Sequence, residues 1–153
     1  MKVVDYFECE NKNYWLEKIS ESEWRAGKYL YELLKSNQLF VKLGINAKVL
    51  MLIDNNELLA YCTLSQKKYD IDSVLSPWLG CVYTYPKYRG HRYSEELIKH
   101  AEKLVFETGF SKVYISTKHE ELYEKYGFVY YGMMTDWRNE VQRVYYKPII
   151  ELK

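Results

Sequence analysis

The sequence lacks several features that mark large classes of protein. Its 22 Lys plus Arg residues nearly balance its 21 Asp plus Glu residues, and the formal net charge is +1. A global basic field is therefore absent, which argues against a nucleic-acid partner. No run reaches about 18 consecutive apolar residues, and the first residues, MKVVDYFECENKN, include no apolar signal core. We expect a cytoplasmic protein that does not associate with a membrane.

Cysteine and histidine are too few and too scattered for a disulfide framework or a metal site. The three cysteines form no CxxC pair, and the three histidines show no metal-ligand spacing. We expect free thiols in a reducing compartment and no bound metal. These residues are Cys9, Cys62, Cys81, His91, His100 and His119.

Linker signals are also scarce, because the chain has only 3 prolines and no repeat or low-complexity tract. A single domain over residues 1–153 is the simplest interpretation. Hydrophobic periodicity predicts alternating strands and helices, with Asn55-Asn56 as a hairpin turn. This order is typical of an α/β domain with a mixed, mostly antiparallel central sheet flanked by helices. The expected strands are 3–8, 48–54, 57–65, 75–85, 111–117, 128–134 and 142–148, and the expected helices are 11–19, 20–37, one ending at 108, and 119–127.

Residues 20–37 carry a clear helical pattern. Ser20 followed by Glu23 resembles a capping box, so we expect this helix to begin there. An apolar stripe follows at helical spacing, and Gly27 lies within it. Because glycine inside a helix costs up to about 1 kcal/mol relative to alanine, we expect close packing at Gly27.

Four basic side chains surround a single glycine in the stretch YPKYRGHRYSEELIKHAEKL, residues 85–104. They follow a predicted strand and precede a predicted amphipathic helix. A helix N-terminus presents unpaired N–H groups, and a glycine before it lets an anion approach the backbone. The pattern favours a phosphate site, with a solvated basic turn capped by Ser94 as the alternative. The residues concerned are Lys87, Arg89, Gly90, His91 and Arg92.

Two segments of the chain resemble a known family. PKYRGHRYSEELIKHAEKL is similar to the acetyl-CoA-binding segment of the GNAT N-acetyltransferase superfamily. KVYIST followed by HEELYEKYGFVYYG is similar to that family's strand, short helix and "LYEKxGF" ending, and WLGCVYTYP matches its central strand. The resemblance covers most of residues 58–146 and implies a GNAT-like acyl-CoA N-acyltransferase fold.

The resemblance implies that acetyl-CoA is the co-substrate. The amides of residues 90–94 would hold its pyrophosphate, and residues 82–84 would pair with the pantetheine arm like an added strand, although core packing explains Val82 equally well. Arg92 stands where the family motif has its first glycine, and Ser94 replaces the last small residue. We expect the Arg92 side chain to contact a phosphate rather than to obstruct it. The expected coenzyme-binding residues are Val82, Tyr83, Thr84, Arg89, Gly90, His91, Arg92, Tyr93 and Ser94.

The resemblance also implies a tyrosine as the acid that protonates the leaving thiolate. Its position here is Tyr123, with Tyr126 or no acid at all as alternatives. Backbone N–H groups of the central strand would stabilise the oxyanion. The sequence does not specify a base for the amine, and the open alternatives are a chain of waters, Asp70, Asp72, His119, Glu120 and Glu121.

The implied function is an enzyme that moves an acetyl group from acetyl-CoA to a primary amine. A catalytically silent CoA-binding regulatory module is the alternative, and a nucleic-acid binder is disfavoured by the net charge. The acceptor is a small-molecule or peptide amine that the sequence does not specify: polyamine, aminoglycoside, amino acid and protein lysine all stay open. A homodimer is also open.

Overall fold

The computed structural model describes residues 1–117 and 122–149. In these ranges seven strands form one sheet in the order β1-β2-β3-β4-β5-β7-β6. All neighbouring strands run antiparallel except β4 and β5, which are parallel. The mixed, mostly antiparallel sheet that the sequence predicts is therefore confirmed. The strands are β1 Lys2–Asp5, β2 Lys48–Asp54, β3 Glu57–Ser65, β4 Trp78–Thr84, β5 Lys112–Thr117, β6 Val129–Thr135 and β7 Val141–Pro148.

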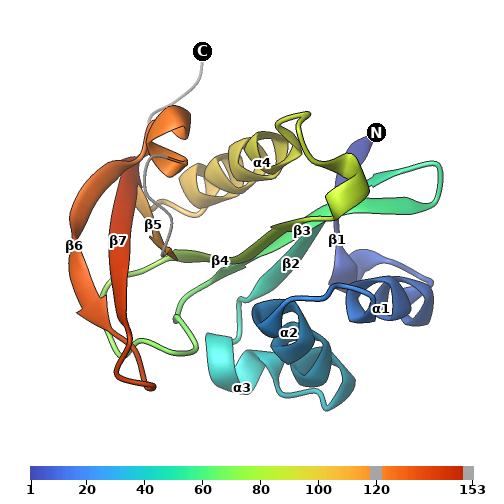
Figure 1. The fold of residues 1–153 in the computed structure, drawn as a ribbon, viewed down its shortest axis with the longest axis horizontal. Helices are drawn as coiled ribbons and strands as arrows, with labels where there is room; N and C mark the ends of the chain where they lie inside the picture. The colour runs from blue at the N-terminus through green and yellow to red at the C-terminus, as the bar shows by residue number, and fades with distance from the viewer. Residues whose placement is uncertain (118–121, 150–153) are drawn as a thin grey trace.

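Helices cover both faces of the sheet (Figure 1). α4 (Tyr93–Glu107) lies on one face, and α1 (Lys12–Ser20), α2 (Arg25–Lys35) and α3 (Leu39–Leu43) lie on the other. Each face has its own apolar core, because alternate residues of a strand point to opposite sides. Three short 3-10 turns complete the described elements: η1 Tyr6–Glu8, η2 Pro86–Tyr88 and η3 Tyr123–Tyr126.

The predicted hairpin between β2 and β3 is confirmed. Asn55 and Asn56 connect the strands with φ angles of +49° and +63°. Asparagine tolerates this left-handed conformation better than most residues, and the twist of such a turn matches that of the strands.

The predicted start of α2 is wrong. Ser20 is the last residue of α1, and α2 begins at Arg25 after Trp24, whose side chain makes no capping bond. The connection between the helices is instead organised by Ser22, which is buried and donates its hydroxyl proton to the carbonyl of Ile19. Tertiary packing of Ser22 decides this boundary, which local capping statistics do not contain. α3 was not predicted either.

The predicted close packing at Gly27 is confirmed. A Cβ at this position would collide with the Tyr61 hydroxyl and with Ser22 Oγ. Those two groups form a buried hydrogen bond of 2.8 Å, in which Tyr61 donates. Gly27 therefore lets α2 approach β3 closely enough to keep this bond.

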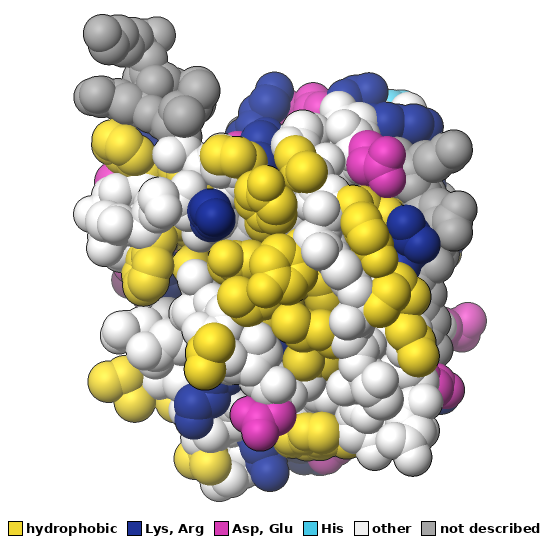
Figure 2. Space-filling view, turned by 90° about the vertical axis from the view of Figure 1, so that its left-hand side faces the viewer, with side chains coloured by type: hydrophobic (Ala, Val, Ile, Leu, Met, Phe, Trp, Pro, Cys, Tyr) yellow, Lys and Arg dark blue, Asp and Glu magenta, His cyan; other side chains and the backbone are white. Residues whose placement is uncertain are grey.

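The outer strand β6 leaves apolar side chains in solvent. Figure 2 shows yellow hydrophobic side chains gathered on this side of the molecule. β6 is an edge strand of the described sheet, where β7 is its one pairing partner. The homodimer stays a prediction. Exposed apolar residues of β6 and β7 are Val129, Tyr130, Tyr131, Met133 and Val141.

Within the described ranges, no helix has the length and apolarity that a membrane crossing requires. All three cysteines are free thiols. Cys62 and Cys81 are buried, and Cys9 is partly exposed.

Candidate active site

The central cavity opens where β4 and β5 part. These parallel strands share two register pairs, Trp78 with Tyr114 and Leu79 with Ile115. Beyond Leu79 no further pair joins the two described strands, and Figure 1 shows β5, β7 and β6 turned away from the rest of the sheet. The gap holds a cavity of about 650 Å³, lined by residues from Gly80 to Thr84 along one wall.

A β-bulge shapes the β4 wall of this cavity. Tyr61 pairs with Tyr83 and Thr63 with Gly80, so Cys81 and Val82 together lie opposite one residue of β3. Cys81 takes a left-handed φ of +48° at this point. A bulge leaves backbone groups outside the ladder and re-aims them. The edge of β4 that faces β5 therefore offers backbone groups to a ligand.

A second cavity of about 290 Å³ adjoins the first. Thr84, Arg89, Ser94 and Leu122 line both cavities, so the two form one path along β4 toward the start of α4. Every coenzyme-binding residue expected from the sequence except His91 lines one of them. His91 stacks on Tyr93 with ring centroids 5.2 Å apart.

The loop before α4 presents a row of free backbone donors. Gly90 and Arg92 both have left-handed φ angles, +91° and +58°. Within the described residues, no backbone carbonyl or side chain accepts a hydrogen bond from the N–H groups of residues 90–94. Consecutive free N–H groups at a helix N-terminus form a concave anion site, and the helix dipole adds to it. The loop therefore fits a pyrophosphate.

The basic side chains around Gly90 already have partners in the protein. Lys87 lies 3.7 Å from Glu57, Arg89 donates through Nε to the carbonyl of Thr84 at 2.9 Å, and Arg92 pairs with Glu95. Glu57 and Glu95 thus offset the charges of Lys87 and Arg92, whereas Arg89 is held by a neutral carbonyl. The free backbone donors, more than the surrounding positive charge, make this an anion site.

Ser94 does not cap α4. Arg92 occupies the N-cap position, and Ser94 Oγ lies 3.1 Å from the hydroxyl of Tyr126. The alternative interpretation, a basic turn capped by Ser94, is therefore wrong in its capping. The Arg92 guanidinium lies over the Tyr126 ring, 5.4 Å from its centroid, which also ties Tyr126 to this loop.

Tyr123 lies in η3, next to Leu122, which lines both cavities. It lines the larger cavity and is 7% exposed. Burial is the main cause that raises the pKa of Tyr123 above its usual value, followed by the neighbouring Cys62 and Tyr126. The phenol therefore keeps its proton at neutral pH. Tyr126 lines only the smaller cavity.

A model of the Acetyltransferase (GNAT) family matches residues 10–128 of the chain. The chain belongs to this family. This membership indicates an acetyl-CoA-dependent N-acetyltransferase, as the sequence resemblance implied. No curated protein sequence matches the chain.

Solved structures of GNAT proteins share this fold at low sequence identity. An aminoglycoside 6'-N-acetyltransferase from Enterococcus faecium is 14% identical with a TM-score of 0.71, and the match covers 100% of this chain and 99% of that chain. An aminoglycoside 6'-N-acetyltransferase complexed with coenzyme A is 14% identical with a TM-score of 0.70, at the same coverage. A GNAT-family acetyltransferase from Staphylococcus aureus Mu50 is 14% identical with a TM-score of 0.65, covering 97% and 99%. At such identities the likeness concerns the fold alone.

The residues considered as the general base of this GNAT protein differ in burial and in their position relative to the cavity. Asp70 is buried and lines the larger cavity, whereas Asp72 is exposed and lies outside the lining. His119, Glu120 and Glu121 lie outside the described residues.

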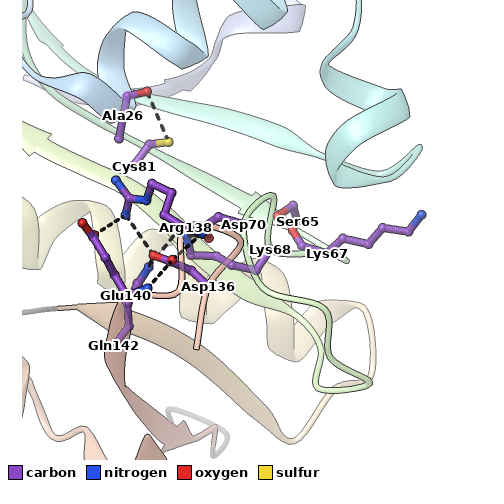
Figure 3. A network of polar contacts seen from close by, with 10 residues as sticks. All are labelled: Ala26, Ser65, Lys67, Lys68, Asp70, Cys81, Asp136, Arg138, Glu140 and Gln142. Atoms are coloured by element: carbon purple, nitrogen blue, oxygen red, sulfur yellow. Dashed lines mark hydrogen bonds and ion pairs between the residues drawn. The ribbon is translucent and has the colours of Figure 1, made fainter. Parts of the chain in front are cut away.

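A polar cluster at the far end of the larger cavity was missed from the sequence (Figure 3). Asp70 pairs with Lys68 at 2.8 Å and accepts from Gln142 Nε2 at 3.0 Å. Gln142 also donates to Asp136 at 2.7 Å, which pairs with Arg138 at 2.9 Å. The backbone N–H of Trp137 donates to the carbonyl of Asp70 at 3.0 Å. The cluster thus joins the loop after β3 to the turn between β6 and β7. The signal for it in the sequence is the charged stretch DWRNE at residues 136–140.

Proposed function

We propose that this GNAT protein transfers the acetyl group of acetyl-CoA to a primary amine, with residues 1–153 acting as one domain. The N–H groups of residues 90–94 hold the pyrophosphate, and the open edge of β4 at Val82–Thr84 pairs with the pantetheine arm. The observation that carries the proposal is this alignment: within the described ranges, the N–H groups of residues 90–94 have no hydrogen-bond acceptor, and they follow a stretch of β4 that is unpaired toward β5 beyond Leu79.

The reaction needs one bond formed and one broken. The neutral amine attacks the thioester carbonyl carbon, the C–N bond forms, and the C–S bond breaks. The amine nitrogen loses a proton, and the departing CoA thiolate gains one. Backbone N–H groups at the β4 bulge are suited to stabilise the oxyanion, because the bulge removes them from the sheet ladder.

Tyr123 is the proton donor in this proposal. A phenol of ordinary pKa near 10 gives its proton to a thiolate of pKa near 8.5 at a cost of about 2 kcal/mol, and the raised pKa of Tyr123 increases this cost, so the donor must be well oriented. Packing of Tyr123 against Phe128, with ring centroids 5.9 Å apart, restricts its ring. Tyr126 is less suited because its hydroxyl lies within hydrogen-bond distance of Ser94.

Coenzyme binding is tested by thermal unfolding with and without acetyl-CoA. A ligand that binds only the folded state stabilises it by mass action. At a hundredfold excess of acetyl-CoA over Kd, the free energy of unfolding should increase by about 3 kcal/mol, and Tm should rise by several degrees. Duplex DNA and RNA at physiological salt should give no comparable rise. A nucleic-acid shift without an acetyl-CoA shift would overturn the proposal. Binding without release of CoA thiol in any amine mixture would instead support a silent regulatory module.

Two glycines provide a matched pair of variants for the same measurement. Gly90 (φ +91°) and Gly109 (φ +88°) share a left-handed backbone, and an added Cβ meets nothing within 4 Å at either. Alanine should therefore strain both loops similarly. Only Gly90→Ala should weaken acetyl-CoA binding, by about tenfold if the loop shifts. Equal losses in the two variants would contradict the assigned phosphate site.

A further inference from the structure

Arg138 lines the part of the larger cavity that lies away from the phosphate loop, which we call the acceptor end. It lies in the turn between β6 and β7, and its side chain is 39% exposed. Figure 3 shows this side chain extending from the turn toward Cys81 at the β4 bulge and toward Ala26 at the start of α2. All three residues line the larger cavity, at the end away from the phosphate loop. Arg138 therefore faces the space that remains for the acceptor.

A buried carboxylate holds Arg138 in place. The side chain of Asp136 is 0% exposed, and it accepts from Gln142 and from the backbone N–H groups of Arg138 and Glu140 at 2.7, 2.9 and 3.1 Å. Asp136 Oδ2 lies 2.9 Å from Arg138 Nη2, and Glu140 Oε2 lies 3.1 Å from the same nitrogen. Both carboxylates thus engage one nitrogen. In the described ranges, Nε and Nη1 of the guanidinium make no hydrogen bond, so three N–H donors remain for a ligand.

Arg25 adds a second cation across the cavity. It is the first residue of α2, it lines the cavity, and it has no ion-pair partner among the described residues. The acidic side chain in the described lining is Asp70, which Lys68 already neutralises at 2.8 Å. Asp136 is enclosed and Glu140 lies outside the lining. A ligand in this space therefore meets cationic donors rather than free carboxylates.

The same end of the cavity has an aromatic wall. Trp24 stacks on Tyr83 with ring centroids 5.5 Å apart and an angle of 13°, and both line the cavity. Tyr69 lines it as well. Such rings suit a flat apolar group better than a heavily hydroxylated one.

We propose that the acceptor is a primary amine that also carries a carboxylate on an aromatic or apolar body, and that Arg138 and Arg25 bind that carboxylate. This inference rests on the proposed acetyl transfer. It predicts that a polycationic amine is a poor substrate, because Arg25 would repel it and the free N–H donors of both arginines would stay unpaired.

The test compares kcat/KM for four amines at saturating acetyl-CoA, corrected for the fraction of neutral amine. Phenethylamine lacks a carboxylate, phenylalanine and 4-(2-aminoethyl)benzoate carry one at different positions, and kanamycin is a polycation. For at least one of the two carboxylate-bearing amines, kcat/KM should exceed that of phenethylamine by about tenfold or more. Kanamycin should have the lowest kcat/KM of the four.

Variants assign the preference to residues. Arg138→Gln and Arg25→Gln should each reduce the carboxylate preference by about tenfold, while Lys28→Gln should leave it unchanged. Lys28 is a matched control, because it is an exposed cation one turn along α2 that does not line the cavity. Arg25 is also exposed, so Arg25→Gln should leave the fold intact. This variant therefore tests the inference even where Arg138→Gln destabilises the protein and lowers Tm.

The outcomes separate this inference from the acetyl transfer itself. Equal rates for the carboxylates and phenethylamine, or preference for kanamycin, would overturn the inference and leave the transfer standing. Thiol release with none of the four, by protein that acetyl-CoA stabilises, would overturn the inference while coenzyme binding stands. A carboxylate preference that survives both arginine variants would also overturn it.

Discussion

The two ends of the cavity are built from different chemical groups. The coenzyme end, residues 89–94, offers backbone N–H groups whose directions are set by left-handed φ angles at Gly90 and Arg92. The acceptor end, around the β6–β7 turn, offers side chains that hold one another: Asp136 orients Arg138, and Gln142 bridges Asp136 to Asp70.

This difference matches the tasks of the two ends. Backbone donors are present in every residue, so a phosphate loop tolerates many side chains and still works. Side-chain networks depend on identity, because removal of one member leaves a buried polar partner unsatisfied. We infer that the coenzyme end determines which cofactor binds and that the acceptor end determines which amine is acetylated.

Tyr123→Phe tests the proposed proton donor, which lines the larger cavity beside Leu122, and should have the largest effect. The variant removes only the hydroxyl, so binding at either end should persist. Positioned acid catalysis contributes about 10²–10⁴-fold, and kcat should fall within that range. Stopped-flow thiol release and acetyl-CoA titration give the two quantities. Tyr126→Phe is the matched control, and a larger loss there would assign the proton donor to the coenzyme end.

The pH dependence of the same step follows from the raised pKa of Tyr123. Burial keeps the phenol protonated until the pH exceeds its usual pKa of about 10, so Tyr123 should cause no fall in kcat below that pH. The stability that its protonated form contributes is present below pH about 10 and is lost as the pH rises further. A kcat profile and urea unfolding at two alkaline pH values, with Tyr123→Phe alongside, check this. A fall near pH 8.5 that disappears in the variant would contradict the assignment.

Gly27→Ala should affect the acceptor end alone. The added methyl group would displace the Tyr61 hydroxyl from Ser22 and push α2 outward, lowering the free energy of unfolding by about 1–3 kcal/mol. Because Trp24 and Arg25 begin the same helix, KM for the acceptor should rise while the Kd for acetyl-CoA stays constant. Lys28→Ala, at the exposed next position, is the control. Equal losses in acceptor and coenzyme binding would show that the two ends are not independent.

Arg92→Gly should have the smallest effect. Arg92 is already left-handed, so glycine keeps the backbone and removes only the exposed side chain that pairs with Glu95. We expect acetyl-CoA binding to weaken by a few-fold and to depend less on salt, because exposed charge contacts are weak and screened. Calorimetry at two salt concentrations measures both. Tighter binding would show that arginine obstructs the phosphate and that side chains matter at this end after all.

The sequence alone determined the features that depend on local patterns. Strand alternation and the Asn55-Asn56 turn predicted the hairpin, and the GNAT-like segments predicted the family. Both depend on residues close together in the chain, which carry their own propensity and spacing. The close packing at Gly27 was also predictable, because glycine destabilises a helix interior relative to alanine and is expected there where space is short.

Only the tertiary structure determined where distant residues meet. Ser22, rather than a capping box at Ser20, organises the start of α2, because Tyr61 of β3 binds it from across the core. Asp70 and Gln142 are 72 positions apart, and no local pattern records that they share a hydrogen bond. The acceptor end combines such long-range contacts with local ones inside the β6–β7 turn, where Asp136 holds Arg138. The chemistry of the acceptor end therefore depends on tertiary packing, whereas the chemistry of the phosphate loop depends on the six consecutive residues 89–94.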